Sequence, residues 1–280
     1  MSVTVISLTI VISFVGVSDR KIAGENVGII EIIGTISESK NIIDNLKAFR
    51  ENDAIKAIVL RIDSPGGAVG PSQEIYQEVR KTTEVKSVIV SMGALAASGG
   101  YYIAAGANGI VANPGTITGS IGVIMGFTNF QQLLEKIGLV PVVIKSGEFK
   151  DIGSPAREMT PAEQQLLQNV IDDIHQQFIT AISDGRKMEI ARIEPIADGR
   201  LITGKAALSL GLVDRLGNLE DAVEWAGSLG GIEGEISTVY PEKEKLPLLR
   251  YLLSSALNPF FSQFLENHFY IDYRLSPEPK

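Results

Sequence analysis

Ser98 lies in the stretch of this chain that is best suited to nucleophilic chemistry. It follows residues 87–91, an apolar and β-branched run typical of a buried strand, and precedes residues 101–106, which predict a short helix. The residues around it are nearly all glycine or alanine, so another backbone can approach closely. Unpaired N–H groups at the start of a helix favour negative charge, such as the oxyanion that a serine nucleophile generates. The position therefore predicts a nucleophile, and a serine that only caps the helix is the alternative.

The turn Ser64-Pro65-Gly66-Gly67 could supply donors for that oxyanion. It ends a predicted strand at residues 57–63, and open α/β sheets build their sites where parallel strands end. We expect the N–H group of Gly66 or Gly67 to form an oxyanion hole together with that of Gly99. The alternative is an ordinary turn with no chemical role.

A serine nucleophile needs a base, and three residues are candidates. His175 lies in a long predicted helix, one position from the apolar stripe, where the alternative is a partly buried packing residue that no acid orients. Lys145 and Lys150 follow a predicted strand, and a lysine becomes a base when burial without a counter-ion lowers its pKa. From the residues alone, either lysine could instead be a solvated surface residue.

The composition excludes other kinds of site. The chain of 280 residues has no cysteine, which rules out a cysteine protease, disulfides and thiolate metal ligands. It has only two histidines, His175 and His268, so a histidine-rich metal site is excluded, and we expect neither a metal nor another cofactor. The formal net charge of −8 argues against a nucleic-acid partner.

The N-terminus predicts a membrane anchor. Residues 1–18 carry no charged side chain, and Asp19, Arg20 and Lys21 end this stretch, which is at the short end of what spans a bilayer. It lacks a basic start and an Ala-x-Ala site, which disfavours a cleaved signal peptide. We expect one uncleaved span at residues 1–19, with a removed signal or a buried strand as alternatives. Taken alone, Arg20 and Lys21 would direct the rest of the chain to the cytoplasmic side.

Strand and helix signals alternate along the chain. Continuous apolar strands are predicted at residues 27–33, 57–63, 87–91, 109–112 and 140–144, and amphipathic helices at residues 38–50, 72–81, 101–106 and 129–138. Residues 114–125 predict a loop with short strands. Strands that are apolar throughout and alternate with helices are typical of a parallel sheet covered on both faces. The pattern therefore predicts an α/β fold with a mostly parallel sheet and outer helices.

The second half of the chain predicts one long helix and a different C-terminal tail. Thr160-Pro161-Ala162-Glu163 is a capping pattern, and an apolar stripe then predicts a core face to about residue 184, through Leu166, Val170, Ile174 and Phe178. Shorter helices are expected from residue 203 to 211 and up to residue 225. The tail at residues 229–280 is rich in Leu, Phe and Ser and is interrupted by Pro247 and Pro259. A membrane-surface segment, a clamp on a neighbouring subunit and partial disorder are equally open for it.

Five motifs stand in the order of one known family. They are Ser-Pro-Gly-Gly, Ser-Met-Gly-x-x-Ala-Ala-Ser-Gly-Gly-Tyr-Tyr, Asn-Pro-Gly-Thr-Ile-Thr-Gly-Ser-Ile-Gly-Val, Lys-Ser-Gly-x-x-Lys-Asp-Ile-Gly-Ser-Pro and Asp-Gly-Arg-x-x-Thr-Gly-x-x-Ala-x-x-x-Gly-Leu-Val-Asp. Together they resemble the short form of the signal peptide peptidase A family (SppA, peptidase family S49), within the Clp-protease/crotonase superfamily. The resemblance covers residues 27–228, and no motif residue departs from the family pattern.

The resemblance implies a crotonase-like fold of repeated ββα units and a membrane-bound serine endopeptidase that degrades hydrophobic remnant signal peptides. Ser98 matches the nucleophile, and Lys150, not Lys145, matches the general base. Ser120 matches the hydroxyl that orients the lysine amine, and Gly66 or Gly67 matches the oxyanion turn. The family implies a homo-oligomeric ring in which serine and lysine come from neighbouring chains, with the catalytic domain outside the cytoplasm.

Two other functions fit parts of the sequence. An acyl-CoA hydratase or isomerase on the same fold would use the same oxyanion turn but needs a carboxylate base, and no glutamate lies in the Ser98 loop. A catalytically silent membrane scaffold that binds peptides would have no need of Ser98, Ser120 and Lys150.

Overall fold

The computed structural model describes residues 26–242 and the backbone of residues 269–274. The predicted anchor at residues 1–19 and most of the predicted tail therefore lie outside the described residues. Within residues 26–242 and 269–274, no helix combines the length and the apolar character that crossing a membrane requires.

The body is built on a sheet whose main path is parallel throughout, in the order β10-β1-β2-β4-β5-β9. The bounds are β1 Asn26–Ile33, β2 Ile55–Ser64, β4 Ser87–Ala97, β5 Gly109–Ala112, β9 Arg215–Leu216 and β10 Ser237–Val239. Two short strands extend one side: β6 (Ile117–Gly119) pairs parallel with β4, and β8 (Leu201–Thr203) pairs antiparallel with β6. The predicted mostly parallel sheet is confirmed.

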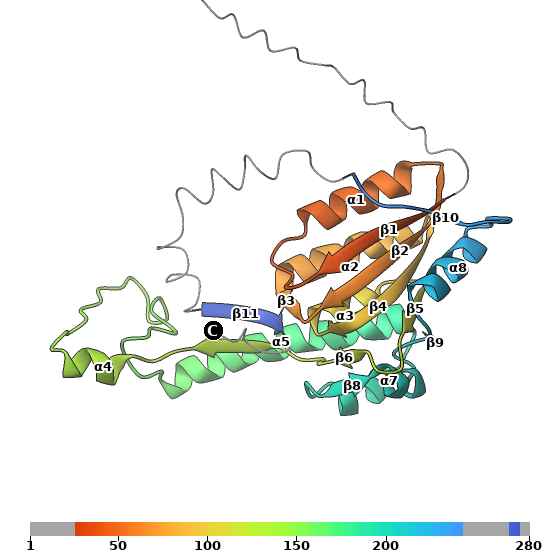
Figure 1. Cartoon of the computed structure of the whole chain (residues 1–280). Coiled ribbons are helices and arrows are strands. Elements are labelled where there is room, and N and C mark those ends of the chain that lie inside the picture. Colours follow the sequence, from red (N-terminus) through yellow and green to blue (C-terminus); the bar gives the residue numbers. More distant parts are fainter. Residues whose placement is uncertain (1–25, 243–268, 275–280) are drawn as a thin grey trace, which may run out of the picture.

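Helices cover both faces of this sheet, which explains why the strands are apolar throughout (Figure 1). The larger core lies under α1 (Lys40–Glu51), α2 (Val69–Thr83), α3 (Gly99–Ala105), the second half of α5 (Pro161–Arg186) and α7 (Gly204–Leu210). A smaller core on the other face lies under α8 (Leu219–Leu229). The chain between α5 and β8 adds a short helix and a 3-10 turn, α6 (Ile190–Ile193) and η1 (Glu194–Ile196).

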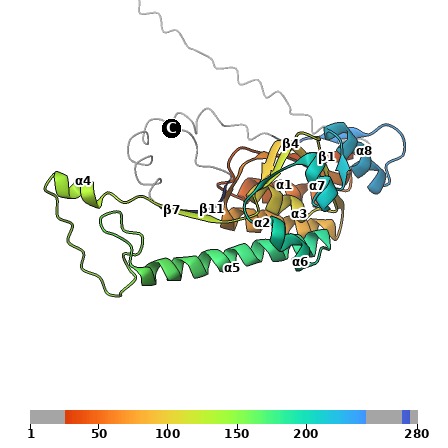
Figure 2. The ribbon, with the colours of Figure 1, turned by 90° about the horizontal axis from the view of Figure 1, so that it is seen from below.

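An arm extends away from this body in both ribbon views (Figures 1 and 2). We define the arm as residues 124–170, which include β7 (Ile124–Phe127), α4 (Gln131–Lys136), an irregular loop and the first half of α5. The strand expected at residues 140–144 is wrong: this segment is irregular, and Val140 and Ile144 are 84% and 97% exposed. A strand needs a paired neighbour, and the described part of the chain places none beside this segment.

The predicted core face of α5 is only partly confirmed. Phe178 is fully buried and Ile174 packs at the edge of the core, but Leu166 and Val170 are exposed. The capping box of Thr160 and Glu163 starts the helix as predicted. The first half of the helix runs along the arm, away from the main sheet (Figure 2), and its apolar stripe is therefore left exposed by the described residues.

A second, smaller sheet joins the body to the arm. Its order is β3-β11-β7, in which β11 (Phe269–Arg274) lies antiparallel between β3 (Gly66–Ala68) and β7. Tyr273 is in register with Gly67 and Arg274 with Gly66. The C-terminal strand therefore pairs with the backbone of the Gly66–Gly67 turn.

Candidate active site

Ser98 lies where β4 ends and α3 begins, as predicted. Its backbone has φ 52° and ψ −117°, a conformation that residues other than glycine rarely adopt. Two backbone hydrogen bonds hold it there: its N–H donates to the carbonyl of Gly119 (2.8 Å) and its carbonyl accepts from the N–H of Tyr102 (2.8 Å). The side chain makes no capping hydrogen bond, so the alternative of a helix cap is wrong.

The helix after Ser98 is fixed by two tyrosines. Tyr101 is fully buried and its hydroxyl donates to the carbonyl of Leu212 (2.9 Å). Tyr102 packs edge-on against Tyr76 and lies against Phe178, with ring centroids 5.1 and 4.9 Å apart. Burial raises the pKa of Tyr101 and raises the pKa of Tyr102 to about 12, so both hydroxyls stay neutral. These contacts hold α3, and with it Ser98, against the body.

The Gly66–Gly67 turn is brought to the start of α3. A Cβ placed on Gly99 would lie 3.3 Å from both the Cα of Gly66 and the nitrogen of Gly67, so the two loops touch through glycine alone. On the edge of β3 that does not pair with β11, two hydrogen bonds join it to Ile36. The Ile36 N–H donates to the Gly66 carbonyl (2.9 Å), and the Ala68 N–H donates to the Ile36 carbonyl (2.8 Å). The predicted convergence of the two loops is thus present.

The two glycines of the turn differ in what their N–H groups do. The Gly66 N–H donates to the hydroxyl of Ser64 (3.1 Å), so it already has a partner. Gly67 lies between the two residues that bond Ile36, and successive N–H groups of an extended chain point to opposite sides, so its N–H points away from Ile36. That edge of β3 pairs with β11, whose Tyr273 is in register with Gly67. The Gly67 N–H would therefore be available to an oxyanion only with a substrate in the place of β11.

Ser120 lies beside Ser98. It follows Gly119, which is in register with Ala97 across the parallel pair of β6 and β4. Its φ of 49° is again unusual for a residue other than glycine, and its N–H donates to the carbonyl of Arg200 (2.8 Å). The ends of the neighbouring strands β4 and β6 thus place Ser98 and Ser120 together. In the sequence, only the family resemblance pointed to Ser120.

The two lysines lie in the arm loop and differ in their surroundings. Lys145 donates to the carboxylate of Asp151 (2.6 Å) and to the carbonyl of Glu148 (2.7 Å). Lys150 is exposed, and its amine makes no ion pair with any residue from 26 to 242. Lys145 is thus engaged by a carboxylate, whereas Lys150 is not paired with one within residues 26–242.

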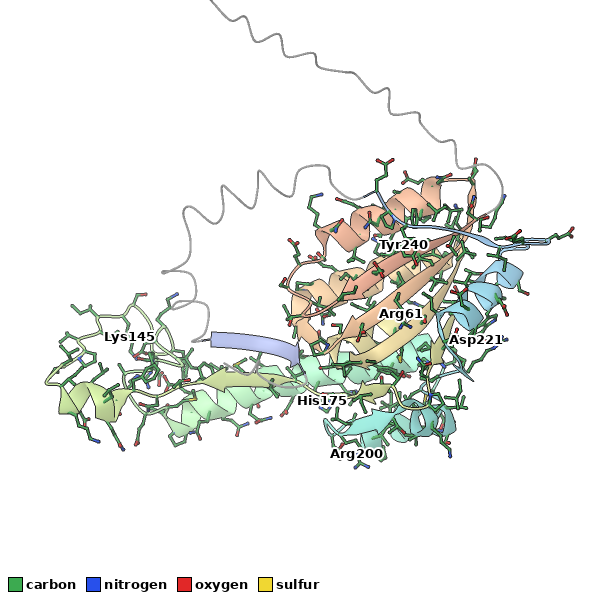
Figure 3. All side chains as sticks on the ribbon, viewed as in Figure 1. Arg61, Lys145, His175, Arg200, Asp221 and Tyr240 are labelled. Atoms are coloured by element: carbon green, nitrogen blue, oxygen red, sulfur yellow. The ribbon has the colours of Figure 1, made fainter. Side chains whose placement is uncertain are left out.

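Within one chain, the loop that carries these lysines is not next to Ser98. Figure 3 places Lys145 in the arm, away from the body that holds β4 and α3, and Lys150 is in the same short loop. The structure therefore brings together Ser98, Ser120, Gly67 and Gly99, but it does not bring Lys150 to them in a single chain.

His175 is the partly buried helix residue that the sequence offered as the alternative to a base. It lies in α5, and its Nε2 is buried with no hydrogen-bond partner in the described part of the chain. With no acid to orient the ring, nothing supports a catalytic role for it.

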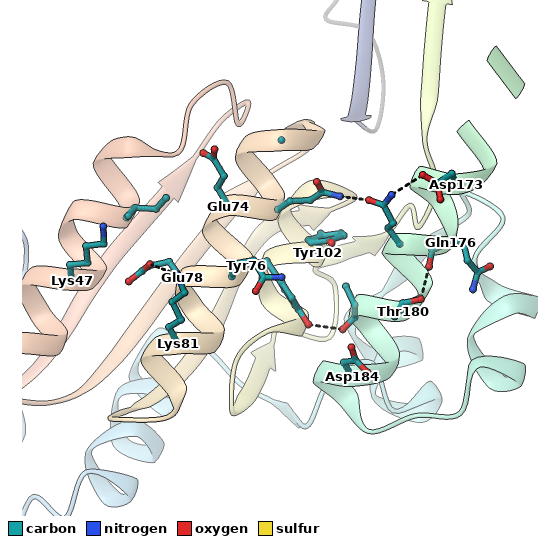
Figure 4. A pocket seen from close by; sticks show the side chains of 16 residues that line it. Lys47, Glu74, Tyr76, Glu78, Lys81, Tyr102, Asp173, Gln176, Thr180 and Asp184 are labelled. Carbon is teal, nitrogen blue, oxygen red and sulfur yellow. Dashed lines mark hydrogen bonds and ion pairs between the residues drawn. The ribbon is translucent and has the colours of Figure 1, made fainter. Parts of the chain in front are cut away.

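A groove of about 820 Å³ lies between α1, α2 and α5 (Figure 4). Tyr102 lines it, together with polar and charged side chains such as Gln73, Glu78 and Asp173. It contains neither Ser98 nor the Gly66–Gly67 turn. Among the residues described, no cluster of histidine and carboxylate side chains could hold a metal ion.

One set of interacting side chains was missed by the sequence analysis. Arg157 binds both Asp151 and Glu163 in the arm loop. The only part of this set that the sequence indicated was Glu163, as a member of the helix-capping pattern. Nothing in the sequence says that an arginine six residues before Glu163 joins it, since the loop between has no regular period.

Comparison with known proteins identifies the family of this chain. Residues 80–233 match the model of peptidase family S49, and residues 25–116 match that of the Clp proteases. The chain belongs to peptidase family S49. This S49 member is therefore a serine peptidase, and its parallel sheet with outer helices is the crotonase/Clp-protease-like fold that the motifs implied.

Relatives of this S49 peptidase occur in several kinds of organism. A protein of Synechocystis named as a protease is 46% identical over 80% of this chain and 81% of its own length. A protein of Enterococcus faecium named as signal peptide peptidase SppA is 37% identical over 66% of this chain and 54% of its own length. A chloroplastic serine protease SPPA of Arabidopsis thaliana is 38% identical over 68% of this chain but 28% of its own length.

Proposed function

We propose that this S49 peptidase is a membrane-bound endopeptidase with a Ser98–Lys150 dyad, which degrades hydrophobic remnant signal peptides. The observation that carries the proposal is the conformation of Ser98. It is held at a positive φ between β4 and α3, makes no capping bond, and lies beside the glycines that line the turn. Strain of this kind costs on the order of 1–3 kcal/mol, and such residues cluster at active sites.

The chemistry uses one proton carrier. Neutral Lys150 Nζ accepts the proton of Ser98 Oγ, and Oγ bonds to the carbonyl carbon of the peptide. The N–H groups of Gly67 and Gly99 hold the tetrahedral oxyanion, each being worth about 3 kcal/mol in the transition state. The C–N bond breaks as Lys150 returns its proton to the leaving amine. Water then attacks the ester, giving a proton to Lys150, and Ser98 Oγ recovers that proton when the acid leaves.

Ser120 orients the lysine in this scheme. Its position beside Ser98, at the end of the neighbouring strand, supports that role. A hydroxyl that accepts from the amine fixes the direction of its lone pair without adding the negative charge that would keep the amine protonated.

The lysine comes from a second chain of a homo-oligomeric ring. In one chain the arm loop extends away from Ser98 (Figures 1 and 3). The arm also exposes many apolar side chains: Leu133, Ile137, Leu139, Val140, Val142, Val143, Ile144, Leu166 and Val170. A contiguous exposed apolar surface of this kind is typical of an interface. Burial there would also dehydrate Lys150, which favours its neutral form.

Two features support the choice of substrate and location. An extended chain can pair with β3, as β11 does, and a peptide substrate would take the place of β11 beside Gly66 and Gly67. Residues 1–18 carry no charge and would anchor the enzyme where remnant signal peptides are left. The resemblance to the family favours a catalytic domain outside the cytoplasm.

The first experiment is hydrolysis of a hydrophobic signal-like peptide by the full chain in detergent, with Ser98→Ala and Lys150→Ala beside the wild type. Loss of more than about 1000-fold in kcat is expected for each variant, while Lys145→Ala retains activity. Equal cleavage by the wild type and both dyad variants would refute the dyad. A wild type with no activity would favour a silent scaffold, and activity on an acyl-CoA ester instead of peptides would favour a hydratase or isomerase.

A mixed oligomer tests the origin of the lysine. Ser98→Ala and Lys150→Ala chains, each inactive, are co-expressed in equal amounts. If each site takes its serine and its lysine from different chains, about one quarter of the sites regain both residues in a random mixture. If both residues come from one chain, every site lacks one of them and the mixture stays inactive.

A further inference from the structure

The arm loop around Lys150 is held by side chains rather than by backbone pairing. The described chain has no helix or strand between Lys136 and Pro161. The other charged residues between Lys136 and α5, with Glu163 at the start of the helix, are Lys145, Glu148, Asp151, Arg157, Glu158 and Glu163. Their mutual contacts therefore decide where the lysine amine lies.

Arg157 is the centre of these contacts. Its Nε donates to Asp151 Oδ2 (2.9 Å), and its Nη1 donates to Glu163 Oε2 (2.8 Å). Its Nη2 donates to Glu163 Oε1 and to the carbonyl of Asp151 (3.1 Å). One planar guanidinium thus joins two carboxylates in a geometry that a lysine ammonium cannot reproduce.

The two carboxylates connect Lys150 to a rigid element. Glu163 is buried and is part of the capping box that starts the 26-residue helix α5. Asp151 is the residue directly after Lys150, and it is bound by Arg157 from one side and by Lys145 from the other. The backbone directly after Lys150 is therefore anchored to α5 through Asp151 and Arg157. The Lys150 amine makes no ion pair with any carboxylate within residues 26–242.

We propose that Arg157 is a positioning residue for the catalytic lysine, acting through Asp151 and Glu163. It fixes the backbone that carries Lys150, and it engages Asp151 Oδ2 and both carboxylate oxygens of Glu163. This inference rests on the proposed role of Lys150 as the base. Loss of Arg157 would free Asp151 Oδ2, while Oδ1 stays bound to Lys145. A freed carboxylate oxygen that pairs with the Lys150 amine favours the ammonium form, so the pH needed for activity would rise.

The test compares the peptidase activity of the full-length wild type with that of Arg157→Met. We expect kcat to fall about 10- to 100-fold while KM changes by less than about twofold, because the base is misplaced but the peptide site is intact. The pH at which kcat reaches half its maximum should rise by about half a unit or more. Adding Asp151→Asn to Arg157→Met should return that pH to the wild-type value without restoring kcat fully.

Two further variants separate positioning from a loss of stability. Arg157→Lys keeps the charge but not the double contact, so it should retain the wild-type pH dependence with a partly recovered kcat. Arg50→Met is the control, because it breaks an ion pair in the body, between Arg50 and Glu78. The side chains of that pair are about as buried as those of Arg157 and Glu163. Arg50→Met should leave the pH dependence of kcat unchanged. Oligomeric state is followed by sedimentation for every variant.

The outcomes distinguish this inference from the proposed function. An assembled Arg157→Met enzyme with wild-type kcat and pH dependence overturns the role of Arg157. Equal kcat losses in Arg157→Met and Arg50→Met, with no change in pH dependence, also overturn it, because that result is loss of stability alone. An active Lys150→Ala enzyme, measured beside them, refutes the dyad itself.

Discussion

At the residue scale, the site depends on backbone positions that admit few side chains. Gly67 is the clearest case, because a Cβ there would lie 2.2 Å from the carbonyl oxygen and 2.6 Å from the nitrogen of Ile36. These are backbone atoms and cannot rotate away. Gly67 lies between the two residues that bond Ile36, so its N–H points away from Ile36, toward the edge of β3 that pairs with β11.

Gly67→Ala should therefore impair the enzyme in two ways. The clash should reduce the free energy of unfolding by about 1–3 kcal/mol. Displacement of an oxyanion donor should reduce kcat by on the order of 100-fold or more. Both effects are measured by thermal unfolding and by peptide hydrolysis of the same preparation.

Gly70→Ala is the matched control for that substitution. Gly70 lies in α2, and a Cβ there would meet nothing within 4 Å. Alanine at a helical position is expected to add about 0.4–1 kcal/mol of stability and to leave kcat unchanged. A Gly67→Ala enzyme as active as Gly70→Ala would exclude Gly67 from the oxyanion hole.

At the scale of elements, the arm loop and the start of α5 form one electrostatic unit. Hydrogen bonds from Arg157 and then from Lys145 hold the pKa of Asp151 well below its usual value. Hydrogen bonds from Arg157 and from the backbone of Thr160 lower the pKa of Glu163 to about 2. Both carboxylates stay charged in moderate acid, so the loop keeps its contacts over a wide pH range.

The pH dependence of stability should report this unit. A carboxyl group whose pKa is lowered by folding stabilises the folded state at pH values above its pKa in the unfolded chain, which is about 4. That contribution is lost as the pH falls through the pKa of the group in the folded state. The wild type should thus unfold at a higher temperature than Arg157→Met at pH 7. The gap should begin to shrink below about pH 4.5 and should be much smaller, but still present, near pH 2, where Glu163 is about half protonated. A gap that stays constant between pH 7 and pH 2.5 would contradict the assignment.

At the scale of the whole molecule, the arm carries apolar surface that residues 26–242 leave exposed. Ile144 is 97% exposed, and its neighbours Val140, Val142 and Val143 are also exposed. The irregular segment has no partner strand in the described chain, although its β-branched sequence favours one. A second chain is the natural partner for this surface under the proposed assembly.

Ile144→Asp should weaken association without unfolding the chain. Because the side chain is exposed within one chain, its circular dichroism spectrum should be unchanged, while sedimentation shifts to smaller species. Activity should fall at least about tenfold if the lysine comes from the neighbour, since an unpaired carboxylate is costly to bury at an interface.

Val85→Asp is the control for that prediction. Val85 is 66% exposed but lies in the turn between α2 and β4, on the body rather than the arm. The same charge placed there should change neither sedimentation nor activity. Unchanged assembly of Ile144→Asp would show that the arm is not an interface.

The features predicted correctly from the sequence rest on local patterns. The apolar run at residues 87–91, the small residues around Ser98 and the capping pattern at Thr160 depend on neighbours within a few positions. Strands that are apolar throughout imply cover on both faces, and therefore a parallel sheet with outer helices. The order of five motifs identified the family in the same way, without any knowledge of contacts.

Only the tertiary structure decided the features that depend on distant contacts. Examples are the placement of β11 between β3 and β7, the partner that occupies the Gly66 N–H, and the Arg157 contacts that hold the Lys150 loop. The strand expected at residues 140–144 failed for the same reason. An apolar β-branched run records that a segment prefers burial and pairing, but pairing is a property of two segments, and the sequence of one does not say where the other lies.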